Sequence, residues 1–383
     1  MSHTGRVTLL MVAKNNEARL SAGVIRSDRL MADGRLIRYY DTAGQSRDAI
    51  DQREREEQPG IGELRLDPLV NEWVAMAAHR QGRIFLPPKE LCPLCPTHDG
   101  LLSEIPESDY EVAVFDNRFP SLRPPSTPWQ LPNLSGIETP IVDAAGKCEV
   151  VCYTAEHAVA FKDLSLARIR TLLEAWRDRT KELSQLDFIE QIFIFENRGE
   201  EIGVTLFHPH GQIYAYSFIT PRTEKMLQVA SSHFKVHGRT LLGDVIAREI
   251  SDEIRIVARN EHWIAYVPWA ARYPFEIHVA PLRQVADLTE LDSEQCDAFP
   301  GVAKEVMQRL DGVFGIEMAY IAAWHQAPVR HGRKELGLHW QITSVRRQPG
   351  KLKYLAGSES AMGAFIMDMK PEQSAAQLRE VKL

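Results

Sequence analysis

The run His208-Pro209-His210-Gly211-Gln212 opens a predicted strand that continues from Gln212 to Ile219. Side chains two residues apart share one face of a strand, so His208, His210 and Gln212 have the spacing to project together. Pro209 cannot donate a ladder hydrogen bond and therefore marks a strand start, an edge or a bulge. Such a break would let His208 turn aside while His210 and Gln212 point into a cleft.

A helix and another strand precede this run. Apolar residues recur at three- and four-residue spacing from Leu166 to Leu183, and Asp163 or Ser165 can cap the start of the predicted helix. Residues 191–195 are rich in β-branched and aromatic side chains and predict a strand. Helix, strand and strand together make one α+β unit.

The second half of the chain repeats this order more loosely. A helical stretch runs to about Leu310, a strand candidate covers 318–322, and His339-Trp340-Gln341-Ile342 aligns with His210-Gly211-Gln212-Ile213. We interpret this as an internal duplication in which only the first copy retains the full run. Strands joined by short loops and packed against helices favour an antiparallel sheet, so the expected fold class is α+β.

Size and composition limit the function. The 383 residues predict two or three domains, and the net charge of −7 argues against broad binding to nucleic acid. No apolar run approaches the roughly 20 residues that cross a bilayer, which predicts no membrane association. Five cysteines do not resemble a disulfide framework and favour the cytoplasm. Residues 1–60 have little periodicity and predict a partly flexible N-terminal arm.

Cys92-Pro93-Leu94-Cys95 places two thiolates on one tight turn, the geometry that grips a zinc ion from two sides. A redox pair is the alternative, but no thioredoxin-like pattern surrounds it, and two buried thiols by chance are another. Further ligands could come from His98, His157 or His208, and the spacing alone leaves His98 and His157 open. Cys148 and Cys152 lie on an apolar run and are predicted to pack in the core.

The residue types of the histidine run predict nucleotidyl transfer. A neutral imidazole, with a pKa of about 6.5, is a nucleophile near pH 7 and needs no separate base. Attack by His210 on the α-phosphorus of a nucleoside diphosphate sugar would release a sugar 1-phosphate, and a second sugar 1-phosphate could reverse the step. The Gln212 amide can donate to the phosphoryl oxygens but supplies no proton, which favours transfer over hydrolysis.

Phosphate groups also need donors. Arg80 and Arg83 can supply charged planar forks, although each could equally be a solvated surface charge. The loop that includes Asn197, Gly203 and Thr205 brings glycines and a hydroxyl just before the predicted nucleophile, and its backbone N–H groups could cradle a diphosphate.

Several motifs in order resemble one known family from about residue 60 to the C-terminus. They are Leu66-Asp67-Pro68-Leu69, His79-Arg80-Gln81-Gly82-Arg83, Cys92-Pro93-Leu94-Cys95, Phe115-Asp116-Asn117-Arg118-Phe119, Phe195-Glu196-Asn197-Arg198-Gly199, the histidine run, Trp324-His325-Gln326-Ala327-Pro328, His339-Trp340-Gln341 and Lys353-Tyr354-Leu355-Ala356-Gly357-Ser358-Glu359. The chain resembles the galactose-1-phosphate uridylyltransferases, a branch of the histidine-triad superfamily.

This resemblance implies tandem histidine-triad-like domains, at 61–225 and 226–383, that form a mainly antiparallel half-barrel sheet flanked by helices. It implies UMP transfer from UDP-glucose to galactose 1-phosphate, giving UDP-galactose and glucose 1-phosphate, in cytoplasmic galactose metabolism. It also implies a homodimer with shared active sites and one structural zinc per chain.

The resemblance also assigns residues. The implied zinc ligands are Cys92, Cys95, His157 and His208. His210 is the implied nucleophile, Gln212 holds the phosphoryl group, and the uridine pocket is lined by Leu94, Phe115 and Asn117. The diphosphate would be surrounded by Arg80, Arg83, Asn197 and Thr205, and the sugar contacts of the partner subunit would be Lys353, Tyr354 and Glu359.

The chain departs from the family pattern at some positions. Some members bind a second metal through a glutamate and three histidines, but here Met226, Thr343 and Val345 replace three of these ligands, so no second metal is expected. Ser358 and Phe365 replace sugar-contacting residues of some members, which leaves the sugar preference open. The rival functions are a related transferase or phosphorylase for another nucleotide sugar such as ADP-glucose, a non-catalytic zinc-stabilised nucleotide-binding protein, and a histidine-triad hydrolase, which Gln212 disfavours.

Overall fold

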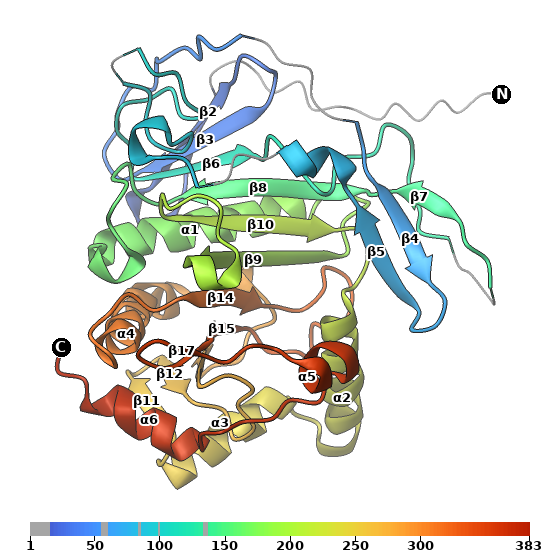
Figure 1. Cartoon of the computed structure of the whole chain (residues 1–383), viewed down its shortest axis with the longest axis vertical. Helices are drawn as coiled ribbons and strands as arrows, with labels where there is room; N and C mark the ends of the chain where they lie inside the picture. Colours follow the sequence, from blue (N-terminus) through green and yellow to red (C-terminus); the bar gives the residue numbers. More distant parts are fainter. Residues whose placement is uncertain (1–15, 55–59, 83–85, 99, 133–136) are drawn as a thin grey trace.

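The structure is a computed structural model that describes residues 16–54, 60–82, 86–98, 100–132 and 137–383. One twelve-stranded sheet runs through the molecule, and every neighbouring pair of its strands is antiparallel (Figure 1). The expected α+β fold with a mainly antiparallel sheet is confirmed, and the sheet is open, with β1 and β11 at its edges. Among the described residues, no helix is long and apolar enough to cross a membrane.

The elements are as follows. In spatial order, the large sheet contains β1 (Asn16–Arg19), β2 (Ile25–Leu30), β3 (Leu36–Asp41), β6 (Val112–Asp116), β8 (Gly146–Cys152), β10 (His210–Tyr216), β9 (Gln191–Arg198), β14 (Tyr320–His325), β15 (His339–Ser344), β13 (Phe275–Pro281), β12 (Trp263–Tyr266) and β11 (Ile256–Arg259). Two small sheets contain β5 (Glu72–Met76), β4 (Glu63–Asp67) and β7 (Ile141–Asp143), and β16 (Arg346–Gln348) with β17 (Lys351–Leu352). The helices are α1 (Leu166–Leu183), α2 (Pro221–His237), α3 (Leu241–Asp252), α4 (Ser293–Gly312), α5 (Gly357–Met362) and α6 (Pro371–Glu380).

The strand order shows the duplication. The strands β8, β10 and β9 on one side of the centre mirror β13, β15 and β14 on the other, and β9 pairs with β14 where the two halves meet. The helix predicted between Leu166 and Leu183 is α1, and the Ser165 side chain caps it by accepting from the backbone N–H of Arg168. The helix of the second half is α4, which contacts α1 directly.

The two faces of the sheet differ in what their side chains contact. On β10, Ile213 and Ala215 are fully buried in the main core, which the α1 and α4 side chains complete. Gln212 and Tyr214 alternate with them and therefore lie on the opposite face. Because the side chains of β10 alternate, one face of the strand packs against the main core and the other face carries the predicted site residues.

The predicted N-terminal arm is wrong for residues 16–41. These residues form β1, β2 and β3, and β3 pairs with β6 to extend the large sheet. The sequence pattern does not show this because β3 buries Arg38 together with its apolar residues, so the usual apolar–polar alternation is absent. Residues 1–15 and 55–59 of the predicted arm lie outside the described residues, and the domain bounds at 60 and 225 stay a prediction.

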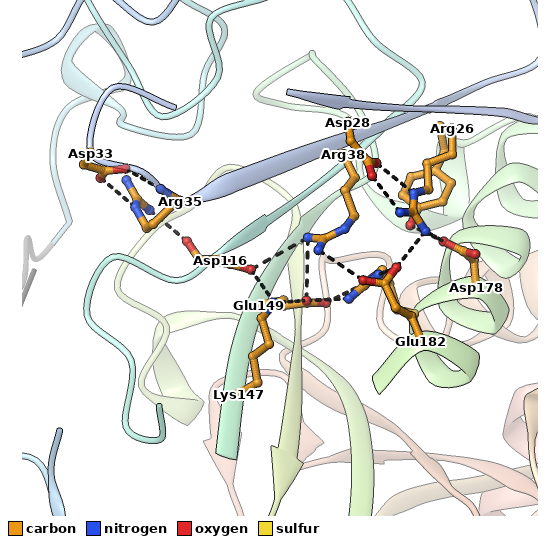
Figure 2. Close-up of polar contacts among 12 residues, drawn as sticks. Arg26, Asp28, Asp33, Arg35, Arg38, Asp116, Lys147, Glu149, Asp178 and Glu182 are labelled. Carbon is orange, nitrogen blue, oxygen red and sulfur yellow. Dashed lines mark hydrogen bonds and ion pairs between the residues drawn. The ribbon is translucent and has the colours of Figure 1, made fainter. Parts of the chain in front are cut away.

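An ion network behind the sheet fastens these added strands to α1 (Figure 2). Arg179 and Glu149 are both fully buried and form two hydrogen bonds of 2.8 Å. Arg38 on β3 lies 3.8 Å from the Glu149 carboxylate, and Arg26 on β2 reaches Glu182 on α1 at 2.7 Å. The buried Glu149 carboxylate therefore compensates the charges of arginines from two separate elements, Arg179 on α1 and Arg38 on β3.

Glu149→Gln is expected to destabilise the protein by about 3–5 kcal/mol at pH 7, because it removes the fully buried counter-charge of Arg179 and Arg38 and leaves them only the more exposed carboxylates of Glu182 and Asp116. Burial would raise the pKa of the Glu149 carboxyl, but Arg179, Lys147 and Arg38 hold this pKa well below its usual value. Its contribution is therefore complete above the unfolded pKa of about 4.5 and declines as the pH falls below it.

Urea unfolding measured from pH 7 to pH 3 checks this expectation. The matched control is Glu63→Gln, which breaks a 2.7 Å ion pair with Arg65 that is about half exposed and should cost at most about 1 kcal/mol. Equal losses for the two variants would contradict a special role of the buried network.

Candidate active site

His210 is the first residue of β10 and lies between two cavities of the structure. Its ring Nδ1 lies 2.7 Å from the carbonyl oxygen of His208. Because a carbonyl can only accept, Nδ1 carries the proton and the neutral ring has its lone pair on Nε2. Burial lowers the pKa of His210, which favours this neutral form. The imidazole is therefore oriented with an unprotonated Nε2.

The first cavity gathers predicted residues from five separate segments. It is lined by Arg80, Leu94, Phe115, Asn117, Thr205, His210 and Gln212. The side chains of Gln212 and Phe115 lie on the same face of the sheet, because Gln212 on β10 and Phe115 on β6 both pair with Val150 on β8. Val150 also lines the cavity. Arg80 is held from the side by a hydrogen bond of 3.1 Å from its guanidinium to the hydroxyl of Tyr214. The cavity thus combines an apolar wall with the His210 imidazole and polar donors.

The Cys-x-x-Cys turn meets two histidines at the edge of this region. The ligand atoms of Cys92, Cys95, His157 and His208 all lie within 4.8 Å of one another. The sulfur of Cys95 is 3.2 Å from Nδ1 of His157 and 3.5 Å from Nδ1 of His208. Two thiols and two imidazoles in such a group match the donor set of a tetrahedral structural zinc site. The group can bind a metal ion.

The surroundings of His208 support this interpretation. Its Nε2–H donates to the carbonyl oxygen of Thr154 at 2.9 Å, which leaves Nδ1 unprotonated on the side of the thiols. Such an outer partner orients metal-binding histidines in general. His98 is exposed and bonds to Pro96 instead, outside the group. The geometry therefore favours His157 over His98, the alternative that the spacing left open.

Other predicted residues are not brought to this cavity. Asn197 lines the second cavity, whereas Gly203, at φ 81°, forms an exposed turn and lines neither. Lys353 pairs with Glu359 at 2.9 Å, Tyr354 is 76% exposed, and these three line neither cavity around His210. Arg83 lies outside the described residues.

The first cavity also contains residues that were not predicted to line it. They are Pro93, Glu104, Arg118, Phe119, Val150 and Leu206. Val150 has the same strand parity as Cys148 and Cys152, which were predicted to pack in the core, so this parity predicted core packing rather than a place at the cavity. Glu104 has no local signal, because its surroundings come from residues far away in sequence.

A duplicated antiparallel sheet with an oriented histidine at the start of a central strand, beside a Cys/His group, defines a protein of the histidine-triad class. The family model described as "Galactose-1-phosphate uridyl transferase, N-terminal domain" matches residues 51–220, and the corresponding C-terminal domain model matches residues 226–382. The chain belongs to the galactose-1-phosphate uridyl transferase family.

Named relatives agree with this assignment. The chain is 40% identical to a galactose-1-phosphate uridylyltransferase of Streptomyces lividans, over 92% of this chain and 96% of the relative. It is 38% identical to that of Thermotoga maritima, over 84% and 99%. A solved structure described as a uridylyltransferase has 31% identity and a TM-score of 0.72, covering 83% of this chain and 98% of its own. The likeness thus spans both halves.

Proposed function

We propose that this chain transfers UMP from UDP-glucose to galactose 1-phosphate through a uridylyl-His210 intermediate, giving glucose 1-phosphate and UDP-galactose. The observation that carries the proposal is the hydrogen bond from Nδ1 of His210 to the carbonyl of His208, which leaves Nε2 free as the nucleophile. The names of the relatives supply galactose 1-phosphate as a substrate and the uridylyl group as the group transferred. Family membership and site geometry therefore support the same chemistry.

The first half-reaction needs no proton donor. The Nε2 lone pair of His210 attacks the α-phosphorus, the bond to the bridging oxygen breaks, and glucose 1-phosphate leaves with the electron pair as a phosphate anion. The Gln212 amide donates to the non-bridging oxygens, where charge increases in the transition state. Arg80, which lines the same cavity, offsets the charge of the diphosphate.

The second half-reaction reverses these steps with another sugar. A phosphate oxygen of galactose 1-phosphate attacks the same phosphorus, and the bond to Nε2 breaks to restore the neutral imidazole. Because Gln212 cannot protonate a leaving group or activate water, the intermediate persists until a sugar phosphate arrives. A ping-pong cycle follows from this.

The Cys92, Cys95, His157 and His208 group would hold one zinc ion per chain with a structural role. When bound, the ion would fix the turn that carries Leu94 and the backbone that carries the His208 carbonyl. In its own chain, the segment with Lys353, Tyr354 and Glu359 lines neither cavity around His210. We further propose, as the family resemblance implies, a homodimer in which that segment contacts the sugar in the active site of the partner subunit.

Intact-mass measurement after incubation with UDP-glucose alone tests the proposal. We expect one uridylyl adduct, located on His210 by peptide mapping, that galactose 1-phosphate discharges to UDP-galactose. ADP-glucose in a parallel reaction should give no adduct. The absence of an uridylyl adduct, its conversion mainly to free UMP, or preferential labelling by ADP-glucose would each overturn the proposal.

A further inference from the structure

A buried glutamate lines the same cavity as His210. Glu104 is 5% exposed and lines this cavity with Leu94, Phe115 and His210. We propose that Glu104 is a specificity-determining residue that accepts hydrogen bonds from the ribose hydroxyls of the nucleotide, and that the N-terminal strands hold it in place. This inference rests on the proposed function and deepens it.

Two arginines fix the carboxylate from behind. Arg35 contacts one oxygen of Glu104 at 2.5 Å, and Arg53 contacts the other at 2.6 Å. Arg53 is itself held by Asp51 at 2.7 Å, and the same carboxylate of Asp51 accepts the backbone N–H of Ala32 at 3.0 Å. The charge of Glu104 is therefore compensated by groups that come from the N-terminal segment.

The same contacts connect Glu104 to the walls of the cavity. Arg35 also donates to the carbonyl oxygen of Asp116 at 2.8 Å, directly after Phe115 (Figure 2). The backbone N–H of Glu104 donates to the carbonyl of Pro93 at 3.0 Å, directly before Leu94. Glu104, Phe115 and Leu94 are thus fixed relative to one another around the position of the nucleoside.

The chemistry of the carboxylate favours ribose over uracil. Its two oxygens can accept about four hydrogen bonds, and Arg35 and Arg53 each contribute one. Arg118 is a third cation nearby, 3.5 Å away. The vicinal hydroxyls of ribose offer two adjacent donors, and acidic side chains bind them in other nucleotide sites. Uracil offers one N–H between two carbonyl groups, and a carboxylate would repel the oxygens of both.

Asn117 is suited to the base instead. Its side-chain oxygen accepts the backbone N–H of Phe119 at 2.8 Å, which orients the amide and leaves its N–H groups as donors for a uracil carbonyl. The apolar side chains of Leu94, Phe115 and Val150 provide the stacking surface. Base and sugar would therefore be recognised by different polar groups.

This assignment gives the N-terminal strands a role. The matching family model begins at residue 51, so β1, β2, β3 and Arg35 lie before it. The strands pair with β6, the strand of Phe115, and they bring Arg35 to Glu104. The added part of the sheet supports the nucleoside pocket rather than the reacting phosphorus.

The test compares UDP-glucose with two analogues that lack the 2′- or the 3′-hydroxyl of the ribose. In the native enzyme, the loss of at least one hydroxyl should lower kcat/KM by roughly 10- to 100-fold, as expected for a hydrogen bond to a charged group. Glu104→Gln should lower kcat/KM for UDP-glucose and reduce the discrimination to within about threefold. The KM for galactose 1-phosphate should change little, because UMP is already covalently attached in that half-reaction.

Arg53→Gln is the positioning variant and should weaken the discrimination in the same direction. Its matched control is Arg65→Gln, at an arginine whose side chain is 54% exposed and outside both cavities, and it should behave as the native enzyme does. If Glu104→Gln does not fold, the test is the discrimination between UDP-glucose and the deoxy analogues, compared between the native enzyme and Arg53→Gln.

If the native enzyme uses UDP-glucose and the two deoxy analogues equally well, the proposed role of Glu104 is overturned. A normal adduct on His210 in the same experiment would leave the proposed function intact. A change in base preference rather than in ribose preference in Glu104→Gln would also overturn it. Absence of any adduct would instead remove the proposed function on which the inference rests.

Discussion

His210→Ala is expected to lower the rate of UMP transfer on the order of 10⁴- to 10⁶-fold, because His210 is the only imidazole among the described residues that line the first cavity. The measurement is a single-turnover reaction with UDP-glucose, followed by release of glucose 1-phosphate and by intact mass. The variant should show neither a burst nor an adduct. Because β10 retains its backbone pairing with β8 and β9, the unfolding midpoint of the variant should stay close to that of the native protein.

Two further variants separate the nucleophile from its surroundings. Gln212→Ala retains Nε2 of His210 but loses a donor to the phosphoryl oxygens, so the adduct should still form, about 10²- to 10³-fold more slowly. His98→Ala removes an exposed histidine that is outside both cavities and should leave the rate unchanged. An adduct formed by His210→Ala at near-native rate would assign the nucleophile to another residue.

Local patterns were sufficient for the elements that carry the site. The spacing of Leu166 to Leu183 predicted α1, and the pattern after Pro209 predicted a strand over 212–219 where β10 covers His210–Tyr216, because neighbouring residues determine both signals. The choice between His98 and His157 needed the fold. His157 is 62 residues beyond Cys95 in the chain, and only the pairing of β8 with β6 and β10 brings it to the thiols.

Buried charges explain the main error. The N-terminal strands have no clear apolar face because β3 buries Arg38 beside Tyr39 and Tyr40, and Arg47, which follows β3 in the chain, is buried as well. Their charges are compensated by carboxylates such as Asp41, which Arg47 contacts at 2.6 Å, and Glu149 on another strand. Such partners cannot be identified without tertiary structure, so a folded part of the sheet resembled a solvated arm. Glu104 was missed for the same reason.

The second copy of the fold shows why only the first retains the site. His339 is the counterpart of His210, and its Nδ1 lies 3.3 Å from the carbonyl oxygen of Gly337. However, Gln341, the counterpart of Gln212, donates to Glu276 at 2.6 Å and accepts from Arg222 at 2.9 Å. Its amide is thus engaged within the protein and is 4% exposed. The second copy is joined to the first through β14, which pairs with β9.

Cys92→Ala is expected to reduce bound zinc from about one ion per chain to nearly none and to lower the free energy of unfolding by about 3–5 kcal/mol. The ion would link the turn at Cys92 to His157 and His208, which come from three separate segments. Elemental analysis gives the metal content, and urea unfolding with and without a chelator gives the stability. The chelator should destabilise the native protein towards the level of the variant.

The same substitution should also slow UMP transfer, by roughly 10- to 100-fold, without removing the adduct. The reason is that the His208 side chain belongs to the metal group while its carbonyl orients His210, so a loosened His208 misplaces the nucleophile. Cys296→Ala is the matched control, because it removes another fully buried thiol, on α4, outside the group. It should retain its zinc and native turnover. Native metal content in Cys92→Ala, or equal kinetic effects in both variants, would contradict the link between the metal group and the nucleophile.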